Sequence, residues 1–536
     1  MTAPEESPQL AASRRAGASL RTGAGTIASR VTGLLRLVAV VYALGGSKSN
    51  SANAYNLANN TPNIVHDLVL GGILTASFVP VFVDRLAHRP RREAERSISA
   101  VFSMSVLVLA VSTVLLVVLA PAIIDLYSLG TPTTSGNAQQ RALAVEFLRY
   151  FAPQVLAYGL ISLLGAVLAT RDRFVAVGIV PVVNNVVGIA ILLLFSRMAS
   201  AVEVTSGRLS GAHVAMLGIG TTAGVVLQAA ALLPSLARSG ARLRLIWRPH
   251  DPALGAIWRL SGWTLGFVAA NQLAVFVVQA LEYHLNKVAD YSYAYQFFLF
   301  PYAVVAVSIV NVATPALARA HAAGDRVALG RTFGSAGRQV LALILPAAIG
   351  YLVLAKPLIA LVLDHGRFVA ADAVQTASTL ALFALGLPAF CIWVLAIRTF
   401  QAMQDTRTAF WCYVLENGAN IALAFAFYRP LGVKGLALAY ALAYTVGAGV
   451  ALAVLRRRLG TIGGRATALS CLRAVVLSLL MALAVAFTSA VLGSGSGLLG
   501  WLRLLVSVTV GGLVYLGGAG VAASMAGWQT SRRPRR

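Results

Sequence analysis

The sequence predicts an all-α integral membrane protein of about fourteen transmembrane helices, arranged as two six-helix lobes followed by two additional C-terminal helices. Hydrophobic residues make up 58% of the 536 positions and charged residues only 11%, whereas soluble domains carry about 45–50% and about 25%. The basic residues gather between long apolar runs, and a pattern of prolines in the first half recurs in the second. A bilayer solvates this much apolar surface directly, while one soluble core could not bury it.

Apolar runs long enough to cross a hydrocarbon core of about 30 Å recur along the whole chain. They lie near residues 22–45, 52–84, 97–127, 138–170, 175–197, 211–237, 253–285, 290–318, 332–363, 373–403, 407–428, 433–455, 467–491 and 498–524. The longest runs are expected to tilt or to extend beyond the bilayer.

The charges of the loops orient these helices. With the N-terminus in the cytoplasm, about 26 Lys and Arg residues fall in cytoplasmic segments and about 7 on the opposite side, as the positive-inside rule requires. An even helix count then places both termini in the cytoplasm. Because the net charge of +25 is explained by this orientation, we do not expect a nucleic-acid partner.

Four residues of the first half, three prolines and one aspartate, recur in the second half at a nearly constant offset of 233 to 236 positions. The pairs are Pro80 and Pro315, Pro121 and Pro357, Pro153 and Pro388, and Asp172 and Asp405. Six helices fit in this offset, so the two halves share one topology and are expected to be related by an axis along the membrane normal, as in some transporters. The predicted parts are a cytoplasmic tail (1–21), an N-lobe (22–238), a basic cytoplasmic linker (239–252), a C-lobe (253–458), two further helices (459–525) and a basic cytoplasmic tail (526–536). Two lobes around a cavity predict transport by alternating access.

Two arginines lie in the first predicted helix. Arg36 is deep in the apolar run and has no acidic neighbour in sequence, so it is a candidate to bind an anionic headgroup such as a phosphate through bidentate hydrogen bonds. Arg30 lies closer to the interface. The alternatives for both are a structural ion pair with another helix or snorkelling to the interface.

The second predicted helix carries a stripe of amides at helical spacing, formed by Asn53, Asn56, Asn60 and Asn63. Such a stripe should face water or a polar ligand, because lipid offers no hydrogen-bond partners; amide bonding between helices is the alternative. His66 and Asp67 follow in the same run, where Asp67 could instead neutralise Arg36. Pro62 and the Gly71-Gly72 pair predict a bend or local unwinding.

Further candidates lie in the second half. Glu416 and Asn420 share one face of the eleventh helix and form a candidate cation site, with polar packing as the alternative. Gln296, after a run of tyrosines, gives the eighth helix a polar entry. The three cysteines lie in apolar runs without metal-ligand or disulfide spacing. No phosphate-loop or hydrolase motif is present, so we expect a transporter and not an enzyme.

Several segments resemble the lipid II flippase family MurJ (MviN). They include Ala28-Ser-Arg-Val-Thr-Gly-Leu-Leu-Arg36, Thr61-Pro-Asn-Ile-Val, Ala76-Ser-Phe-Val-Pro80, Pro181-Val-Val-Asn-Asn185, Phe300-Pro301 and Arg398-Thr-Phe-Gln-Ala-Met-Gln-Asp-Thr-Arg407. The family belongs to the superfamily of multidrug extruders and polysaccharide flippases. The resemblance implies a protein of the bacterial plasma membrane that moves undecaprenyl-pyrophosphate-linked peptidoglycan precursor from the inner to the outer leaflet. It also implies a cationic cavity, an apolar groove along the last two helices for the lipid tail, and sodium or the membrane potential as the energy source, without other cofactors.

The residues that would line the cavity differ from the family pattern. The two family arginines of the first helix are present as Arg30 and Arg36, whereas other charged family positions are replaced by Leu37, Asn53, His66, Asp67, Gly71 and Gln296. Arginines and acids of the family pattern are replaced together, as expected if the charges of the cavity have changed in a coordinated way. The expected partners are the lipid-linked precursor, membrane lipids and other cell-wall synthesis proteins. Two alternatives stay open: a flippase or exporter of the same fold for another lipid-linked glycan or amphiphile, and a transport-inactive scaffold for cell-wall enzymes.

Overall fold

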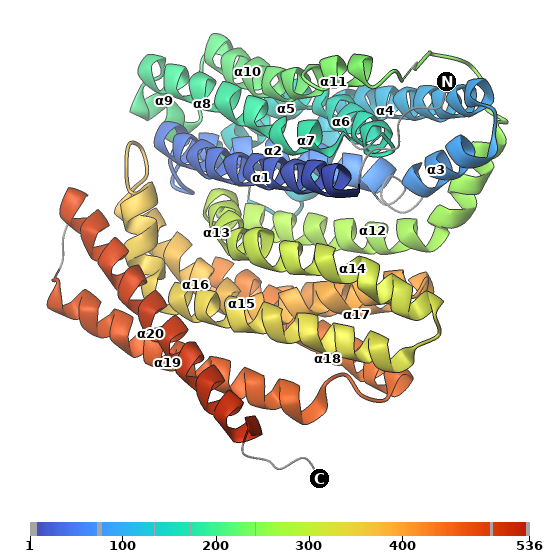
Figure 1. The fold of residues 1–536 in the computed structure, drawn as a ribbon. Helices are drawn as coiled ribbons and strands as arrows, with labels where there is room; N and C mark the ends of the chain where they lie inside the picture. Colours follow the sequence, from blue (N-terminus) through green and yellow to red (C-terminus); the bar gives the residue numbers. More distant parts are fainter. Residues whose placement is uncertain are drawn as a thin grey trace. The chain divides into compact units, whose positions relative to one another are not determined.

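The computed structural model describes residues 8–71, 78–132, 134–171, 173–241, 243–493 and 497–531, and all regular elements in these ranges are helical (Figure 1). The predicted all-α class is therefore confirmed for this part of the chain. The recurring aspartate Asp172, Gly72 and the outermost residues of both predicted tails, 1–7 and 532–536, lie outside the described residues. Contacts between Cα atoms divide the chain into unit 1, Met1–Ala289, and unit 2, Asp290–Arg536.

The described residues of unit 1 form twelve α-helices. They are α1 (Pro8–Leu44), α2 (Asn50–His66), α3 (Val79–His88), α4 (Arg91–Tyr127), α5 (Ser135–Phe151), α6 (Gln154–Ala169), α7 (Phe174–Ile179), α8 (Pro181–Met198), α9 (Ala201–Ser206), α10 (Gly211–Ala230), α11 (Leu233–Arg238) and α12 (Pro252–His284). Helix α2 packs against α5 and α6, and α1 packs against α8. The first helix begins at Pro8, well before the predicted start near residue 22, although its membrane-like stretch is Ile27–Leu44.

The predicted linker 239–252 is held along α4. The Ser103 hydroxyl accepts a hydrogen bond from the Ile246 backbone N–H over 2.9 Å and donates to the Arg244 carbonyl over 3.3 Å. Asp251 then caps α12 by accepting from the Ala253 N–H over 2.9 Å. Helix α12 packs against α4 and α2, and so it lies in unit 1, although the predicted boundary in the linker would place it at the start of the C-lobe.

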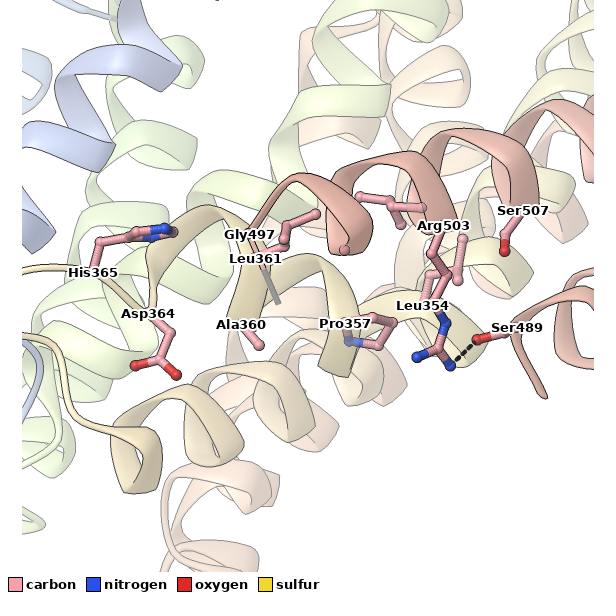
Figure 2. A pocket seen from close by; sticks show the side chains of 12 residues that line it. Leu354, Pro357, Ala360, Leu361, Asp364, His365, Ser489, Gly497, Arg503 and Ser507 are labelled. Carbon is pink, nitrogen blue, oxygen red and sulfur yellow. Dashed lines mark hydrogen bonds between the residues drawn. The ribbon is translucent and has the colours of Figure 1, made fainter. Parts of the chain in front are cut away.

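Unit 2 contains the remaining helices. They are α13 (Val288–Pro301), α14 (Val307–Ala322), α15 (Arg326–Leu363), α16 (Ala370–Ala402), α17 (Thr406–Leu431), α18 (Val433–Leu459), α19 (Gly464–Val491) and α20 (Gly497–Ser531). Helix α16 is largely buried between α15, α17 and α18. Helices α19 and α20 lie side by side and pack on α15 through a small apolar cluster formed by Leu354, Met481, Val485 and Tyr515 (Figure 1). These three helices also enclose a cavity of about 360 Å³ (Figure 2).

Twelve helices of the described chain are long and apolar enough to cross a membrane. They coincide with twelve of the fourteen predicted runs, and the two runs without a counterpart are 52–84 and 407–428. These two are the most polar of the set, because one carries the amide stripe with His66 and Asp67 and the other carries Glu416 and Asn420. Residues 72–77 of the first run lie outside the described residues, and the polar residues around Glu416 lower the mean hydropathy of the second. The count of fourteen stays a prediction.

Two segments change from α-helical to π-helical geometry. They are Asp67–Gly71, which continues α2, and Tyr302–Ala306, which joins α13 to α14. The first agrees with the bend predicted from Pro62 and the glycine pair. The two segments start 235 positions apart, from residue 67 to residue 302, which is the offset found between Pro80 and Pro315.

Candidate functional site

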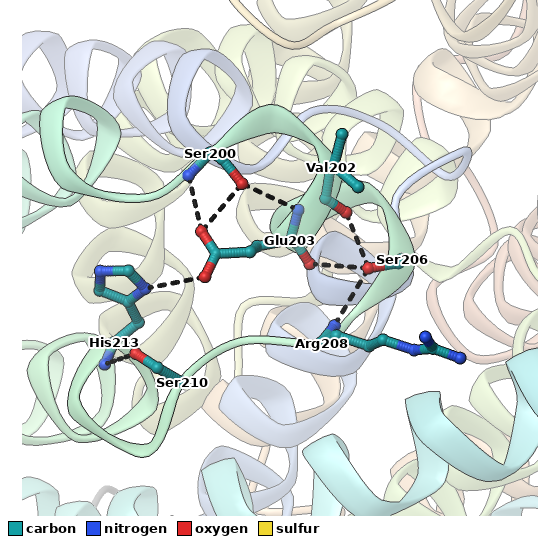
Figure 3. A network of polar contacts seen from close by, with 7 residues as sticks. All are labelled: Ser200, Val202, Glu203, Ser206, Arg208, Ser210 and His213. Atoms are coloured by element: carbon teal, nitrogen blue, oxygen red, sulfur yellow. Dashed lines mark hydrogen bonds and ion pairs between the residues drawn. The ribbon is translucent and has the colours of Figure 1, made fainter.

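The start of α2 is held by the short loop around α9. Ser200 and Glu203 form a reciprocal cap, in which the Glu203 carboxylate accepts from the Ser200 N–H over 2.8 Å (Figure 3). The carbonyls of this loop in turn accept hydrogen bonds from α2: the Ser49 hydroxyl donates to Val204 over 3.0 Å, and the Asn50 amide donates to Ser206 over 3.1 Å. The polar helix α2 is therefore fixed at its first turn.

All hydrogen-bond partners of the Asn53 side chain lie in unit 1. Its side-chain amide donates to the Ser47 carbonyl over 2.9 Å and to Asn286 Oδ1 over 2.8 Å, and its oxygen accepts from the Ala289 N–H over 3.0 Å. Asn286 has a φ of 53°, a left-handed conformation that asparagine tolerates, at the turn after α12. The fully buried Asn53 thus joins α2 to the end of α12, as the interhelical alternative anticipated.

The other amides of the stripe differ from Asn53. Asn56 is buried and donates to the Ala52 carbonyl of its own helix over 2.8 Å. Asn60 and Asn63 are half-buried, and Asn63 donates to the Asn59 carbonyl over 3.2 Å. The second half of the stripe is therefore the part that keeps accessible polar surface.

His66 and Asp67 form a chain of polar contacts with α6 and α12. His66 Nδ1 lies 3.1 Å from Asp67 Oδ1, and His66 Nε2 lies 3.4 Å from the Ser162 hydroxyl of α6. Asp67 Oδ2 accepts from the Gln272 amide of α12 over 3.2 Å. The carboxylate of Asp67 is consequently held by His66 and Gln272, and it does not form an ion pair with Arg36 in the described structure.

Arg36 lies half-buried on α1, where this helix packs against α8. A Cβ added at Gly188 of α8 would lie 2.9 Å from Arg36 Nε, so glycine at this position leaves the space that the arginine occupies. The Tyr158 hydroxyl of α6 donates to the Gln154 side chain over 3.3 Å. Among the described residues Arg36 has neither an ion pair nor a hydrogen bond.

An arginine without a counter-ion inside a membrane protein is costly unless it meets an anion or water. Arg36 presents five N–H donors in a planar fork that matches a phosphate. Arg30, on the same helix, is exposed and also forms no hydrogen bond or ion pair with the described residues. The candidate site on unit 1 thus contains two arginines and the half-buried amides of α2, and its Asp67 carboxylate is held by His66 and Gln272.

Several residues of this region could not be identified from the sequence. Tyr158 and Ser162 are spaced i, i+4 on α6, and His66 faces both of them, with its ring 6.1 Å from that of Tyr158. Gln272 of α12 contributes the amide that donates to Asp67. Glu282, also on α12, is buried with an oxygen that has no partner among the described residues. Isolated Tyr, Ser and Gln residues in apolar runs carry no spacing signal, whereas Glu282 could have been noticed as an acid inside a predicted span.

In unit 2, Gln296 is exposed on α13, while its neighbours turn inward. The Tyr295 and Tyr440 hydroxyls lie 3.5 Å apart, and Tyr295 is packed among the rings of Phe298 and Phe383. The tyrosines before Gln296 therefore belong to an aromatic core of this unit, and only Gln296 itself offers polar surface.

Glu416 is completely buried on α17, and both of its carboxyl oxygens are without a hydrogen-bond partner in the described structure. The side-chain oxygen of Asn420, one turn further along, is likewise unsatisfied. Gly447 of α18 allows close packing, since a Cβ there would lie 3.0 Å from Glu416 Cγ. A buried carboxylate in this state requires a proton or a bound cation. The described residues hold no cluster of three or more His, Cys, Asp or Glu side chains suited to a metal ion.

Comparison with known proteins assigns the chain to a family. A model of the family described as "Lipid II flippase MurJ" matches residues 40–502, which is most of the sequence. The chain belongs to the MurJ family. This is a family of transporters and not of enzymes, and its multi-pass members lie in the bacterial inner membrane, which agrees with the twelve apolar helices.

Curated relatives agree with this assignment. "Probable lipid II flippase MurJ" of Rhizobium meliloti is 27% identical over 421 residues, covering 78% of this chain and 76% of the relative. The protein of the same name from Rhizobium tropici is 26% identical over 499 residues, covering 92% and 91%. These alignments include both units.

Solved structures show the same fold. A structure titled "Lipid II flippase MurJ, inward closed conformation" has a TM-score of 0.76 at 21% identity, covering 94% of this chain and 99% of that one. An inward-facing multidrug resistance MATE family transporter of the MOP superfamily has a TM-score of 0.66 at 14% identity, covering 81% and 96%. The predicted family is therefore confirmed by the family model, and these solved structures share its fold.

Proposed function

We propose that this protein is a flippase that moves lipid II, a polyprenyl-diphosphate-linked peptidoglycan precursor, from the inner to the outer leaflet by alternating access. Membership in the MurJ family carries the proposal, and Arg36, which has no ion pair or hydrogen bond among the described residues, supplies the chemistry for a diphosphate. Each charge-assisted hydrogen bond from a guanidinium to a phosphate contributes about 1.5–3 kcal/mol. The exposed Arg30 and the half-buried Asn60, Asn63 and His66 would complete the lining of the cavity.

The proposed topology has fourteen helices with both ends in the cytoplasm. It adds to the twelve apolar spans the predicted run 52–84, which contains α2 and α3, and the helix α17. The equal offset of the two π-helical segments and of the prolines supports two repeated lobes. The last two helices, within 459–525, would give the lipid tail an apolar groove.

We also propose that Glu416 and Asn420 bind the coupling cation, with sodium as the first candidate. The support is the pair of unsatisfied carboxyl oxygens and the unsatisfied amide oxygen on one face of α17, since hard cations prefer oxygen ligands. In purified protein, Na⁺ should raise the unfolding temperature relative to choline, and Glu416→Gln should remove this Na⁺ effect. An equal Na⁺ effect in the variant would exclude Glu416 as a ligand.

The function is tested by replacing a depleted lipid II flippase in a bacterial host. We expect the wild-type chain to restore growth, and Arg36→Ala to lower lipid II translocation at least roughly tenfold, because charge-assisted bonds are lost. Arg197→Ala is the matched control, because Arg197 is exposed at the end of α8. Failure of the correctly inserted wild-type chain to complement would favour another lipid-linked glycan or amphiphile as substrate. Full complementation by both Arg36→Ala and Arg30→Ala, with cell-wall enzymes still bound, would favour the scaffold.

A further inference from the structure

The cavity between α15, α19 and α20 has a polar end inside apolar walls. Figure 2 shows Arg503, Ser489 and Ser507 at one end, and Asp364 and His365 at the other. Asp364 and His365 are exposed, so their end is the mouth of the cavity. The walls between the two ends are formed by Leu354, Pro357, Ala360, Leu361 and Leu504.

The polar end contains hydrogen-bond donors that have no partner among the described residues. Arg503 donates through Nη2 to the Ser489 hydroxyl over 2.6 Å, whereas its Nε–H is buried and has no partner among the described residues. The Ser507 side chain, one turn further along α20, is only 1% exposed and its hydroxyl is equally without a partner. A buried unsatisfied donor costs about 1–3 kcal/mol, and more when it is charged. Two such groups on residues that line one cavity suggest an acceptor that binds there after a small side-chain movement.

The position of Arg503 argues for a ligand carried by the membrane. The arginine lies six residues after Gly497, the first residue of α20, or roughly 9 Å along the helix. An arginine that only snorkels to the interface would turn its whole guanidinium to water, yet the Nε of Arg503 is buried beside Ser507. The small residues Gly497 and Gly500 leave room at the start of α20, and a cavity of about 360 Å³ lies in the range of small-ligand sites.

We propose that this cavity binds the phosphate of a membrane phospholipid, with Arg503, Ser489 and Ser507 as its ligands and with Leu354, Leu361 and Leu504 against the start of the acyl chains. Arg503 Nε and Nη2 form the fork that accommodates two phosphate oxygens, and the Ser507 hydroxyl donates to one of them. The carboxylate of Asp364 at the mouth disfavours entry of a free anion from the water, which favours a phosphate carried by a lipid. The site belongs to the face of the membrane where α15 ends and α20 begins, and it is separate from the Arg36 site of unit 1.

The test uses the purified full-length chain in detergent and counts bound lipids by native mass spectrometry. The probes are phosphatidylglycerol, diacylglycerol with the same acyl chains but no phosphate, and inorganic phosphate alone. We expect phosphatidylglycerol to bind, diacylglycerol to bind at least tenfold more weakly, and millimolar inorganic phosphate not to displace the lipid. Arg503→Gln should weaken phosphatidylglycerol binding about ten- to hundredfold, and Ser507→Ala several-fold.

The control is Arg473→Gln, which removes an exposed arginine from the other helix of the same pair and should leave binding unchanged. If Arg503→Gln does not fold, Ser507→Ala and Arg503→Lys decide, because both keep a charge at position 503. Equal binding of phosphatidylglycerol and diacylglycerol, or equal losses in Arg503→Gln and Arg473→Gln, would overturn the proposal. Displacement by inorganic phosphate would overturn the lipid as its source. Binding is measured without transport, so a failure here is distinct from a failure of the proposed flippase activity.

Discussion

The contact between Gly188 and Arg36 allows the proposed role of Arg36 to be tested without changing any charge. The substitution is Gly188→Ala, which adds one methyl group on α8. That Cβ would lie 2.9 Å from Arg36 Nε, 3.3 Å from Cδ and 3.4 Å from Cζ. Ordinary van der Waals contact begins near 3.4 Å, so the arginine must move by about 0.5 Å or more.

The expected effect on folding is small. The methyl group meets the outer part of a flexible side chain, which can rotate away, and alanine is favoured over glycine in a helix by up to about 1 kcal/mol. The effect on the bound diphosphate is larger, because the guanidinium fork loses its alignment with two oxygens. Loss of one charge-assisted hydrogen bond, about 1.5–3 kcal/mol, corresponds to a roughly ten- to hundredfold weaker interaction.

The assay is lipid II translocation in proteoliposomes, combined with thermal unfolding of the same preparations. Gly350→Ala is the matched control, because Gly350 lies within the membrane-spanning helix α15 and a Cβ there meets nothing within 4 Å. We expect Gly188→Ala to lower translocation about tenfold with an almost unchanged unfolding temperature, and Gly350→Ala to change neither.

The reasoning is refuted if Gly188→Ala transports as well as wild type while Arg36→Ala is inactive. That combination would mean that the position of the guanidinium beside α8 is irrelevant to its role. A loss of activity accompanied by an equal loss of stability in Gly188→Ala would indicate a packing defect instead.

Two further predictions concern stability. Asn53→Ala should lower the free energy of unfolding by about 1–3 kcal/mol, because it leaves the buried Ala289 N–H without its acceptor; Asn60→Ala should change it far less, and thermal unfolding of both variants measures the difference. Asp405 caps α17 and pairs with Arg458; burial opposes its ionisation, but the hydrogen bonds from Thr408 and Arg458 outweigh this and lower the pKa of Asp405 below its ordinary 3.8. Because the folded pKa is the lower one, the ion pair stabilises the protein above about pH 4 and this contribution is lost as pH falls further. Asp405→Asn should therefore be less stable than wild type near pH 7, and the gap in unfolding temperature should close below about pH 4; a gap independent of pH would contradict the assignment.

Much of the fold follows from the sequence alone, because solvation by lipid acts residue by residue. A run of apolar residues is transferred into a bilayer whatever its tertiary neighbours are, so hydropathy was sufficient for the twelve spans. The motifs between Ala28 and Arg407 were sufficient to predict the family, and the match of the family model over residues 40–502 confirms it.

The role of each polar residue was decided only by the tertiary structure. In sequence, Asn53 and Asn60 are equivalent members of one stripe. In the structure, however, the Asn53 side chain is hydrogen-bonded to Asn286 and Ala289, more than two hundred positions away. The sequence allowed Asp67 to form an ion pair with Arg36, but in the structure the Asp67 carboxylate contacts His66 and Gln272 instead. The unsatisfied donors of Arg503 and Ser507 likewise have no signal in the sequence. A hydrogen bond depends on atoms brought within about 3 Å by packing, and no local pattern of residues encodes which distant atom will be there.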